Sequence, residues 1–210
     1  MTRRIPQPPL LLVTDRRQAR RPLTAIVAAA LDAGCRWVSL REKDLPADEQ
    51  ILLARSLLAL VHTHGGKLML HGEAALARDA GMDGVHLPSG RDATAARALI
   101  GADKILGVSI HTVTEAERID PAHVDYALAG PAFETPSKPG YGPALGTAAL
   151  RAAAEREIPV LALGGVTTET AGACLAAGAR GVAVMGEIMR ADDPAETVGD
   201  LVRACEGAGR

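Results

Sequence analysis

The sequence of 210 residues predicts a single (β/α)8 barrel of the TIM type. Short apolar runs alternate along the chain with segments of helical periodicity, an order typical of parallel strands that are covered by helices. Eight such runs favour closure into a barrel over an open doubly wound sheet, which is the alternative. Because no change in composition marks a boundary, we expect one domain over residues 1–210.

Each expected strand is a buried run of aliphatic residues, and most expected helices end at a glycine, as helices commonly do. The strands are expected at residues 10–13, 37–40, 67–70, 84–87, 105–108, 126–129, 160–163 and 182–185. The helices are expected at residues 22–33, 47–60, 73–80, 93–100, 114–118, 168–177 and 194–204. Residues 131–146, rich in Gly and Pro, form the one long irregular segment, and such a loop is usually a lid or a binding loop.

Two of the expected strands near the end of the chain run into glycine turns. Gly164 and Gly165 follow the seventh strand, and Gly186 follows Met185 after the eighth. Glycine lets backbone N–H groups approach an anion, and a following helix N-terminus adds partial positive charge. These turns therefore predict a phosphate site like the one after strands seven and eight of many barrels. The alternative is that the glycines only form tight turns.

The side chains that follow the other strands form the rest of the expected site, because active sites of this fold lie at the carboxyl ends of the strands. Arg41 and Lys43 are cations suited to anionic ligand groups. His71 is either a core histidine or a proton carrier, since its ordinary pKa is near neutral. The remaining candidates are hydroxyls, a carboxylate and a lysine, namely Ser109, Glu134, Thr135, Ser137 and Lys138.

Composition excludes several classes of protein. A formal net charge of −2 gives no reason to expect a nucleic-acid or membrane partner. The first apolar run is too short for a membrane span. Three widely spaced cysteines without a Cys-x-x-Cys pair disfavour a disulfide framework or a zinc site, and free thiols suit the cytoplasm. The oligomeric state is left open, with a homodimer as one possibility.

Seven motifs in a fixed order resemble the thiamine phosphate synthase and TenI (thiazole tautomerase) superfamily. The resemblance extends over nearly the whole chain. The motifs lie at residues 40–43, 83–87, 107–111, 125–126, 130–138, 162–166 and 181–185.

The synthase branch joins hydroxymethylpyrimidine diphosphate to a thiazole phosphate and releases diphosphate. The resemblance implies that diphosphate would bind to Arg41, Lys43, Ser109 and Lys138. It implies Thr135 and Ser137 near the thiazole, with Gly164, Gly165, Met185 and Gly186 around its phosphate. It also implies Mg²⁺, which neutralises the charge of the departing diphosphate.

The sequence departs from the synthase pattern where the metal ligands are expected. His71-Gly72 stands in place of an Asn-Asp pair, Arg91 or a shifted Asp92 takes the place of a second aspartate, and Ser39 replaces a glutamine. Loss of carboxylates weakens the binding of a hard cation. Mg²⁺, with Asp92 as a ligand, is therefore expected only if the chain is a synthase, and otherwise no cofactor is expected.

These departures lead to three hypotheses. We favour a TenI-like enzyme that binds a thiazole phosphate and transfers a proton, with His71, Lys43 and Glu134 as the catalytic candidates. The histidine that transfers the proton in the TenI type member would fall at Pro131, so His71 would have to replace it. The first alternative is a diverged thiamine phosphate synthase. The second is a non-catalytic protein that binds thiamine intermediates.

Overall fold

Eight parallel strands close into a barrel in the computed structural model, which describes residues 5–134, 146–156 and 158–207. Each strand pairs with its neighbours in sequence order, and β1 pairs with β8. The strands are β1 (Leu10–Val13), β2 (Trp37–Leu40), β3 (Lys67–His71), β4 (Gly84–Leu87), β5 (Ile105–Ile110), β6 (Tyr126–Ala129), β7 (Val160–Leu163) and β8 (Gly181–Val184). The predicted (β/α)8 TIM barrel is confirmed.

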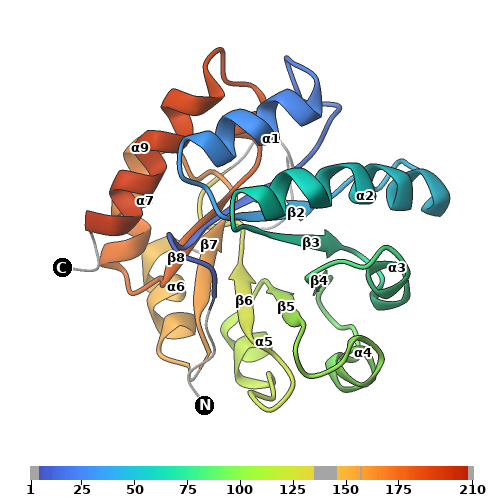
Figure 1. Ribbon diagram of the computed structural model, residues 1–210. Helices are drawn as coiled ribbons and strands as arrows, with labels where there is room; N and C mark the ends of the chain where they lie inside the picture. The colour runs from blue at the N-terminus through green and yellow to red at the C-terminus, as the bar shows by residue number, and fades with distance from the viewer. Residues whose placement is uncertain (1–4, 135–145, 157, 208–210) are drawn as a thin grey trace.

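Helices surround the barrel and cover the outer face of the sheet (Figure 1). They are α1 (Leu23–Asp32), α2 (Ala47–Thr63), α3 (Ala74–Asp79), α4 (Ala93–Ile100), α5 (Val113–Glu117), α6 (Gly146–Ala154), α7 (Thr168–Ala176), α8 (Gly186–Met189) and α9 (Pro194–Gly207). Helices α6 and α8 were not among the expected elements. Strands β3 and β5 are longer than expected, and the extra residues place His71 and Ser109 within the sheet.

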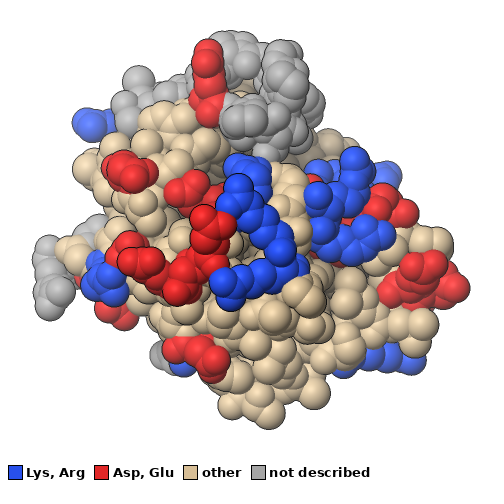
Figure 2. Space-filling view, turned by 90° about the horizontal axis from the view of Figure 1, so that it is seen from above, with Lys and Arg blue, Asp and Glu red and all other residues tan. Residues whose placement is uncertain are grey.

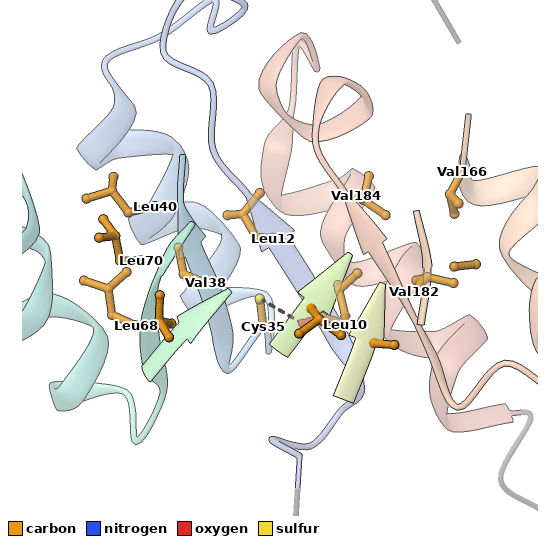
Figure 3. Close-up of a cluster of buried hydrophobic side chains, with 14 of the residues drawn as sticks. Leu10, Leu12, Cys35, Val38, Leu40, Leu68, Leu70, Val166, Val182 and Val184 are labelled. Atoms are coloured by element: carbon orange, nitrogen blue, oxygen red, sulfur yellow. Dashed lines mark hydrogen bonds between the residues drawn. The ribbon is translucent and has the colours of Figure 1, made fainter. Parts of the chain in front are cut away.

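The barrel has two apolar layers because successive strand residues point to opposite faces. The outer layer lies between strands and helices, and Figure 3 shows part of it around Leu10, Val38, Leu68 and Val182. The inner layer fills the barrel with a separate cluster that includes Leu11, Val13, Trp37, Met69, Tyr126, Leu128 and Leu161. Trp37 and Tyr126 meet edge to face at 4.7 Å between ring centroids, so two of the few aromatic residues lie together inside the barrel.

Strand β5 makes room for the Tyr126 ring through Gly107. A Cβ atom at Gly107 would lie 2.1 Å from the Tyr126 Cζ atom, which is far inside van der Waals contact. The glycine therefore lets a large ring cross the barrel interior directly below Ser109, which lies two residues further along the same strand.

Three cysteines are buried and form no disulfide: Cys35, Cys174 and Cys205. The Cys35 thiol lies 3.7 Å from the Leu10 carbonyl oxygen within the outer layer (Figure 3). Burial raises the pKa of the Cys35 thiol, so it is a packing residue rather than a nucleophile.

The surface carries charges of both signs. Figure 2 shows basic side chains gathered on one face with acidic side chains next to them. Ion pairs of this kind include Arg16 with Asp44 and Arg20 with Asp192. Among the helices that the structure describes, none is long and apolar enough to cross a membrane.

Candidate active site

A cavity of about 740 Å³ opens at the carboxyl ends of the strands. It is within the size range of small-molecule sites. Most of the predicted site residues line it, namely Arg41, Lys43, His71, Ser109, Glu134, Gly164, Gly165, Met185 and Gly186. Thr135, Ser137 and Lys138 lie outside the described residues, and Asp92 is not among the residues that line the cavity.

The segment after β2 divides its charged residues between the cavity and the protein interior. Arg41 and Lys43 line the cavity, whereas Glu42 is buried with 1 % of its surface exposed. The Glu42 carboxylate accepts hydrogen bonds from the Thr14 hydroxyl at 2.7 Å and from the Arg16 N–H at 3.0 Å. Burial raises the pKa of Glu42 despite these bonds. Glu42 thus ties the ends of β1 and β2 together and holds its two basic neighbours at the mouth.

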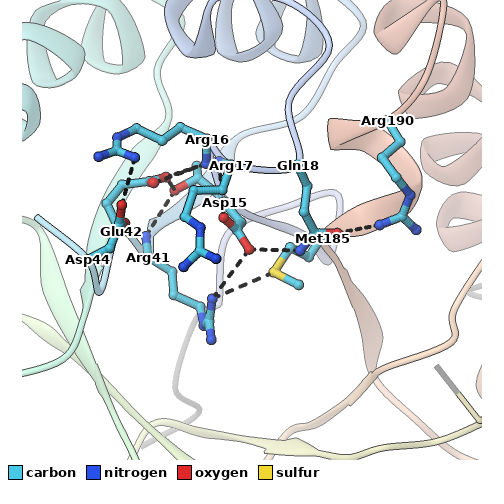
Figure 4. Close-up of polar contacts among 10 residues, drawn as sticks. Asp15, Arg16, Arg17, Gln18, Arg41, Glu42, Asp44, Met185 and Arg190 are labelled. Atoms are coloured by element: carbon cyan, nitrogen blue, oxygen red, sulfur yellow. Dashed lines mark hydrogen bonds and ion pairs between the residues drawn. The ribbon is translucent and has the colours of Figure 1, made fainter. Parts of the chain in front are cut away.

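The Arg41 side chain extends across the mouth toward β8. Its guanidinium lies 3.9 Å from the Asp15 carboxylate and 4.0 Å from the Met185 sulfur. Figure 4 shows this group in contact with both residues, with Gln18 and Arg190 beyond them. Arg41 therefore stands closer to the turn after β8 than the sequence alone indicates.

The first glycine turn is shaped by the segment that follows β6. Gly164 and Gly165 have φ values of +92° and +66°, in the region that favours glycine. A Cβ atom at Gly165 would lie 2.7 Å from the Glu134 carbonyl oxygen. The Phe133 N–H also donates to the Gly164 carbonyl at 3.0 Å. These glycines thus admit a neighbouring chain segment as well as lining the cavity.

The second turn differs in what surrounds it. Gly186 is the first residue of α8, and the three atoms nearest to a Cβ atom there all belong to the guanidinium of Arg190. Arg190 lines the cavity and donates a hydrogen bond to the Gln18 side chain. Arg190 was not selected from the sequence, because it lies four residues beyond the glycine, in a helical turn that was not expected.

Two histidines stack below the mouth. His71 is 8 % exposed and its ring centroid lies 4.5 Å from that of His86, which is fully buried. His86 Nδ1 lies 3.1 Å from the Tyr126 hydroxyl, and Nε2 lies 2.9 Å from the Ser109 hydroxyl. Burial, with a smaller contribution from Lys43, lowers the pKa of His86 to about 3, so the ring is neutral. His71 therefore lines the cavity, whereas His86 lies beneath it and connects Tyr126 to Ser109.

A second polar cluster lies on the cavity wall near β5. His111 Nδ1 lies 2.6 Å from the Gly130 carbonyl, so this nitrogen carries the proton. The Glu115 carboxylate accepts hydrogen bonds from the His111 N–H and from the Ser89 hydroxyl. Glu115 and Ser89 were not selected from the sequence, because a carboxylate in a short helix and a serine in a turn are ordinary surface residues.

Comparison with known proteins identifies the family of this chain. The thiamine monophosphate synthase family model (TMP-TENI) matches residues 10–188. The chain belongs to the thiamine monophosphate synthase family. It is therefore a protein of thiamine biosynthesis, as the motifs predicted.

Individual relatives agree with the family. A putative thiamine-phosphate synthase of Geobacter sulfurreducens is 43% identical over 190 residues, covering 89% of each chain. A thiamine-phosphate synthase of Roseiflexus sp. is 42% identical, covering 87% of this chain and 79% of the relative. The structure of a thiamine phosphate pyrophosphorylase from Pyrococcus furiosus superposes with a TM-score of 0.85 at 27% identity, covering 95% and 96% of the two chains. These names favour the synthase branch over the TenI-like branch that the sequence favours.

The magnesium implied by the synthase branch lacks its expected ligands here. His71 and Gly72 stand at the end of β3, and the Asp92 carboxylate accepts a hydrogen bond from the Ala95 N–H at 3.0 Å as the N-cap of α4. Among the residues that the structure describes, no group of three or more His, Cys, Asp or Glu side chains is placed to hold a metal ion. The residues present do not fit the expected metal site, and no step proposed below depends on a metal.

Proposed function

We propose that the chain is a thiamine-phosphate synthase, which joins hydroxymethylpyrimidine diphosphate to a thiazole phosphate and releases diphosphate. The observation that carries the proposal is the presence of two sets of anion-binding groups in one cavity. One set consists of the glycine turns after β7 and β8, and the other of Lys43 after β2 and Ser109 on β5. The names of the relatives support the same reaction.

The two sets suit the two substrates. The turn at Gly186, with Arg190 beside it, would hold the thiazole phosphate. Lys43 and Ser109 would hold the diphosphate. As the thiazole nitrogen forms its bond to the pyrimidine methylene carbon, the bond from that carbon to the diphosphate oxygen breaks. Negative charge then grows on the leaving group, and fixed cations and donors stabilise it.

Proton transfer on a thiazole phosphate is the second candidate, and the position of His71 favours it. His71 lines the cavity at the place where the synthase pattern has its metal-binding pair. Glu134 lines the same cavity, so a second acid or base is at hand. A tautomerase would bind the phosphate at the glycine turns and use one of these groups as the proton carrier.

Assays with both sets of substrates distinguish the candidates. The protein is incubated with hydroxymethylpyrimidine diphosphate and thiazole phosphate, with and without MgCl2, and separately with the thiazole carboxylate tautomer. We expect thiamine phosphate and diphosphate to form in equal amounts. Conversion of the tautomer alone would replace the proposal by the second candidate. If neither reaction occurs and thiazole phosphate still raises the melting temperature, the chain is a binding protein.

Substitution of Lys43 tests the diphosphate site. Lys43→Met is expected to lower kcat/KM roughly a hundredfold, because a charge that stabilises the leaving group is lost. Lys67→Met is the matched control, since Lys67 is an exposed lysine at the opposite end of the barrel, paired with Asp83 at 3.2 Å. Equal activity of the two variants would contradict the assignment of Lys43.

A further inference from the structure

The Ser109 hydroxyl lies at the end of a hydrogen-bonded chain that begins inside the barrel. The chain runs from the Tyr126 hydroxyl through the His86 ring to Ser109, with contacts of 3.1 and 2.9 Å. Tyr126 and His86 are fully buried, whereas Ser109 is half-buried and lines the cavity. A buried chain thus connects to the cavity through a single hydroxyl.

The direction of the hydrogen bonds follows from what each end of the chain contacts. A neutral imidazole donates from one nitrogen and accepts at the other, and burial with the nearby Lys43 lowers the pKa of His86 to about 3. Within the described part of the protein, His86 is the hydrogen-bond partner of the Tyr126 hydroxyl. If His86 donated to Tyr126, the phenolic hydrogen would be left without an acceptor in the core, which is costly.

If the hydrogen bonds run in the opposite direction, the Tyr126 hydroxyl and both His86 ring nitrogens have a partner. The Tyr126 hydroxyl donates to His86 Nδ1, and His86 Nε2–H donates to the Ser109 oxygen. Among the described residues no acceptor is then left for the Ser109 hydrogen, and because Ser109 lines the cavity, water or an anion there can accept it. Burial also raises the pKa of Tyr126, so its hydroxyl keeps the proton that it donates.

We propose that Tyr126 and His86 are positioning residues, which fix the Ser109 hydroxyl as a hydrogen-bond donor to an anionic group in the cavity. The proposal rests on the proposed function only for the identity of the anion, a diphosphate. Gly107 belongs to the same arrangement, because any side chain there would displace the Tyr126 ring.

A double-mutant cycle on pyrophosphate binding tests the proposal without turnover. Tyr126→Phe removes the hydroxyl that holds His86 Nδ1 as an acceptor, so the orientation of the His86 ring and of the Ser109 hydroxyl is no longer fixed. We expect Tyr126→Phe and Ser109→Ala each to raise the calorimetric Kd for pyrophosphate roughly tenfold. The double variant is expected to be no weaker than Ser109→Ala, because Tyr126 acts through Ser109. Equal effects of Tyr126→Phe in both backgrounds would overturn the proposal, as would the failure of the wild type to bind pyrophosphate.

The tautomer of His86 provides a second, independent measurement. Nitrogen-15 NMR of the histidine-labelled protein, assigned with His86→Gln, is expected to show the proton on Nε2. A proton on Nδ1 would contradict the proposed direction. Ser56→Ala is the matched control for loss of a serine hydroxyl. Ser56 is exposed on α2, away from the cavity, and its hydroxyl donates to the Leu53 carbonyl at 2.7 Å. It is expected to leave the pyrophosphate Kd unchanged. If the double-mutant cycle on pyrophosphate binding gives the expected result but the protein forms no thiamine phosphate, the synthase function is disproved. The positioning role of Tyr126 and His86 is then retained.

Discussion

The glycines in the turns after β7 and β8 serve different purposes. Gly165 has a positive φ and lies against the Glu134 carbonyl and the Phe133 Cβ atom, so a side chain there disturbs the backbone. Gly186 is not among the glycines with a positive φ, and the atoms nearest to an added Cβ belong to the end of the flexible Arg190 side chain. If substitution of Gly186 abolishes phosphate binding, the loss therefore reports on the site. The same loss on substitution of Gly165 would also result from a disturbed backbone.

Gly186→Ala is expected to weaken the binding of thiazole phosphate with little loss of stability. The added methyl displaces the Arg190 guanidinium and covers the first N–H groups of α8, and we expect a roughly tenfold rise in Kd. Calorimetric titration measures the Kd, and a thermal melt measures stability. Gly165→Ala provides the contrast, because it should lower the melting temperature by several degrees. Unchanged affinity of Gly186→Ala would rule out this turn as the phosphate site.

His86 makes stability depend on pH. Its pKa falls from an ordinary 6.5 to about 3 in the folded protein, mainly through burial, so the unfolded chain binds more protons between these values. The contribution of His86 to the free energy of unfolding must therefore fall as the pH drops through 6.5. Between pH 7.5 and 5.5 the loss from this group is about 1.4 kcal/mol. Glu42, with its raised pKa, acts in the opposite sense above its ordinary 4.5, but equally in wild type and variant.

Urea unfolding of the wild type and His86→Gln at both pH values isolates this contribution. The wild type is expected to lose about 1.4 kcal/mol more than the variant on acidification. Parallel changes in the two proteins would show that the pKa of His86 is not lowered in the folded state.

Most cavity residues were predictable one at a time, because the residues that follow parallel strands converge at one end of a barrel. Arg41 and Lys43 were found in this way. The opposite roles of Glu42 and Lys43 follow only from a tertiary contact, the hydrogen bond from Thr14, which lies 28 positions away in sequence. Arg190 and Glu115 were missed for the same reason, since their neighbours in the chain give no sign of the cavity.

Among the elements, α4 decides the role of Asp92. Asp92 is the N-cap of this helix, and its carboxylate accepts from the Ala95 N–H. Asn is as good an N-cap as Asp, whereas Ala is not. We therefore expect Asp92→Ala to lower the free energy of unfolding by about 1 kcal/mol and Asp92→Asn to leave it nearly unchanged.

The same two variants test Asp92 as a metal ligand. Both variants are expected to keep the wild-type dependence of activity on magnesium concentration, because the Asp92 carboxylate caps α4 and does not bind the metal. If Asp92→Asn needed a higher magnesium concentration than the wild type for the same activity, Asp92 would be a metal ligand after all. Denaturant titration and a magnesium titration of the synthase assay provide the two measurements.

The strands and long helices followed from periodicity, but two helices did not. Helix α8 has only four residues and begins at a glycine, so it has neither the length nor the cap from which helices are identified. Helix α6 begins at Gly146, where a segment rich in Gly and Pro ends, and its alanine-rich sequence has few large apolar residues to mark a buried face. Strand β5 continued through Ser109 because the barrel pairs it with β6, which a single strand cannot reveal.

For the molecule as a whole, closure between the first and last strands completes the barrel. Strand β1 pairs with β8 through Leu10 and Val182, and the Val182 N–H donates to the Pro9 carbonyl at 3.0 Å. This pairing joins segments that lie more than 160 residues apart in sequence, the longest separation of any strand pair in the sheet. The positions of the glycine turns relative to Arg41 depend on this closure, because Arg41 reaches across β1 to Met185.

Gly181 allows this closure, and its substitution is expected to weaken the whole molecule. A Cβ atom at Gly181 would lie 2.1 Å from the Pro9 carbonyl oxygen, which is backbone and cannot turn aside. Gly181→Ala should therefore lower the free energy of unfolding by about 2 kcal/mol or more. Gly172→Ala in α7 is the matched control, since nothing lies within 4 Å of its added Cβ atom. Removing a glycine from the interior of a helix should raise stability by about 0.5–1 kcal/mol. Urea unfolding measures both, and equal stability of the two variants would contradict the view that the contact between β8 and Pro9 limits closure.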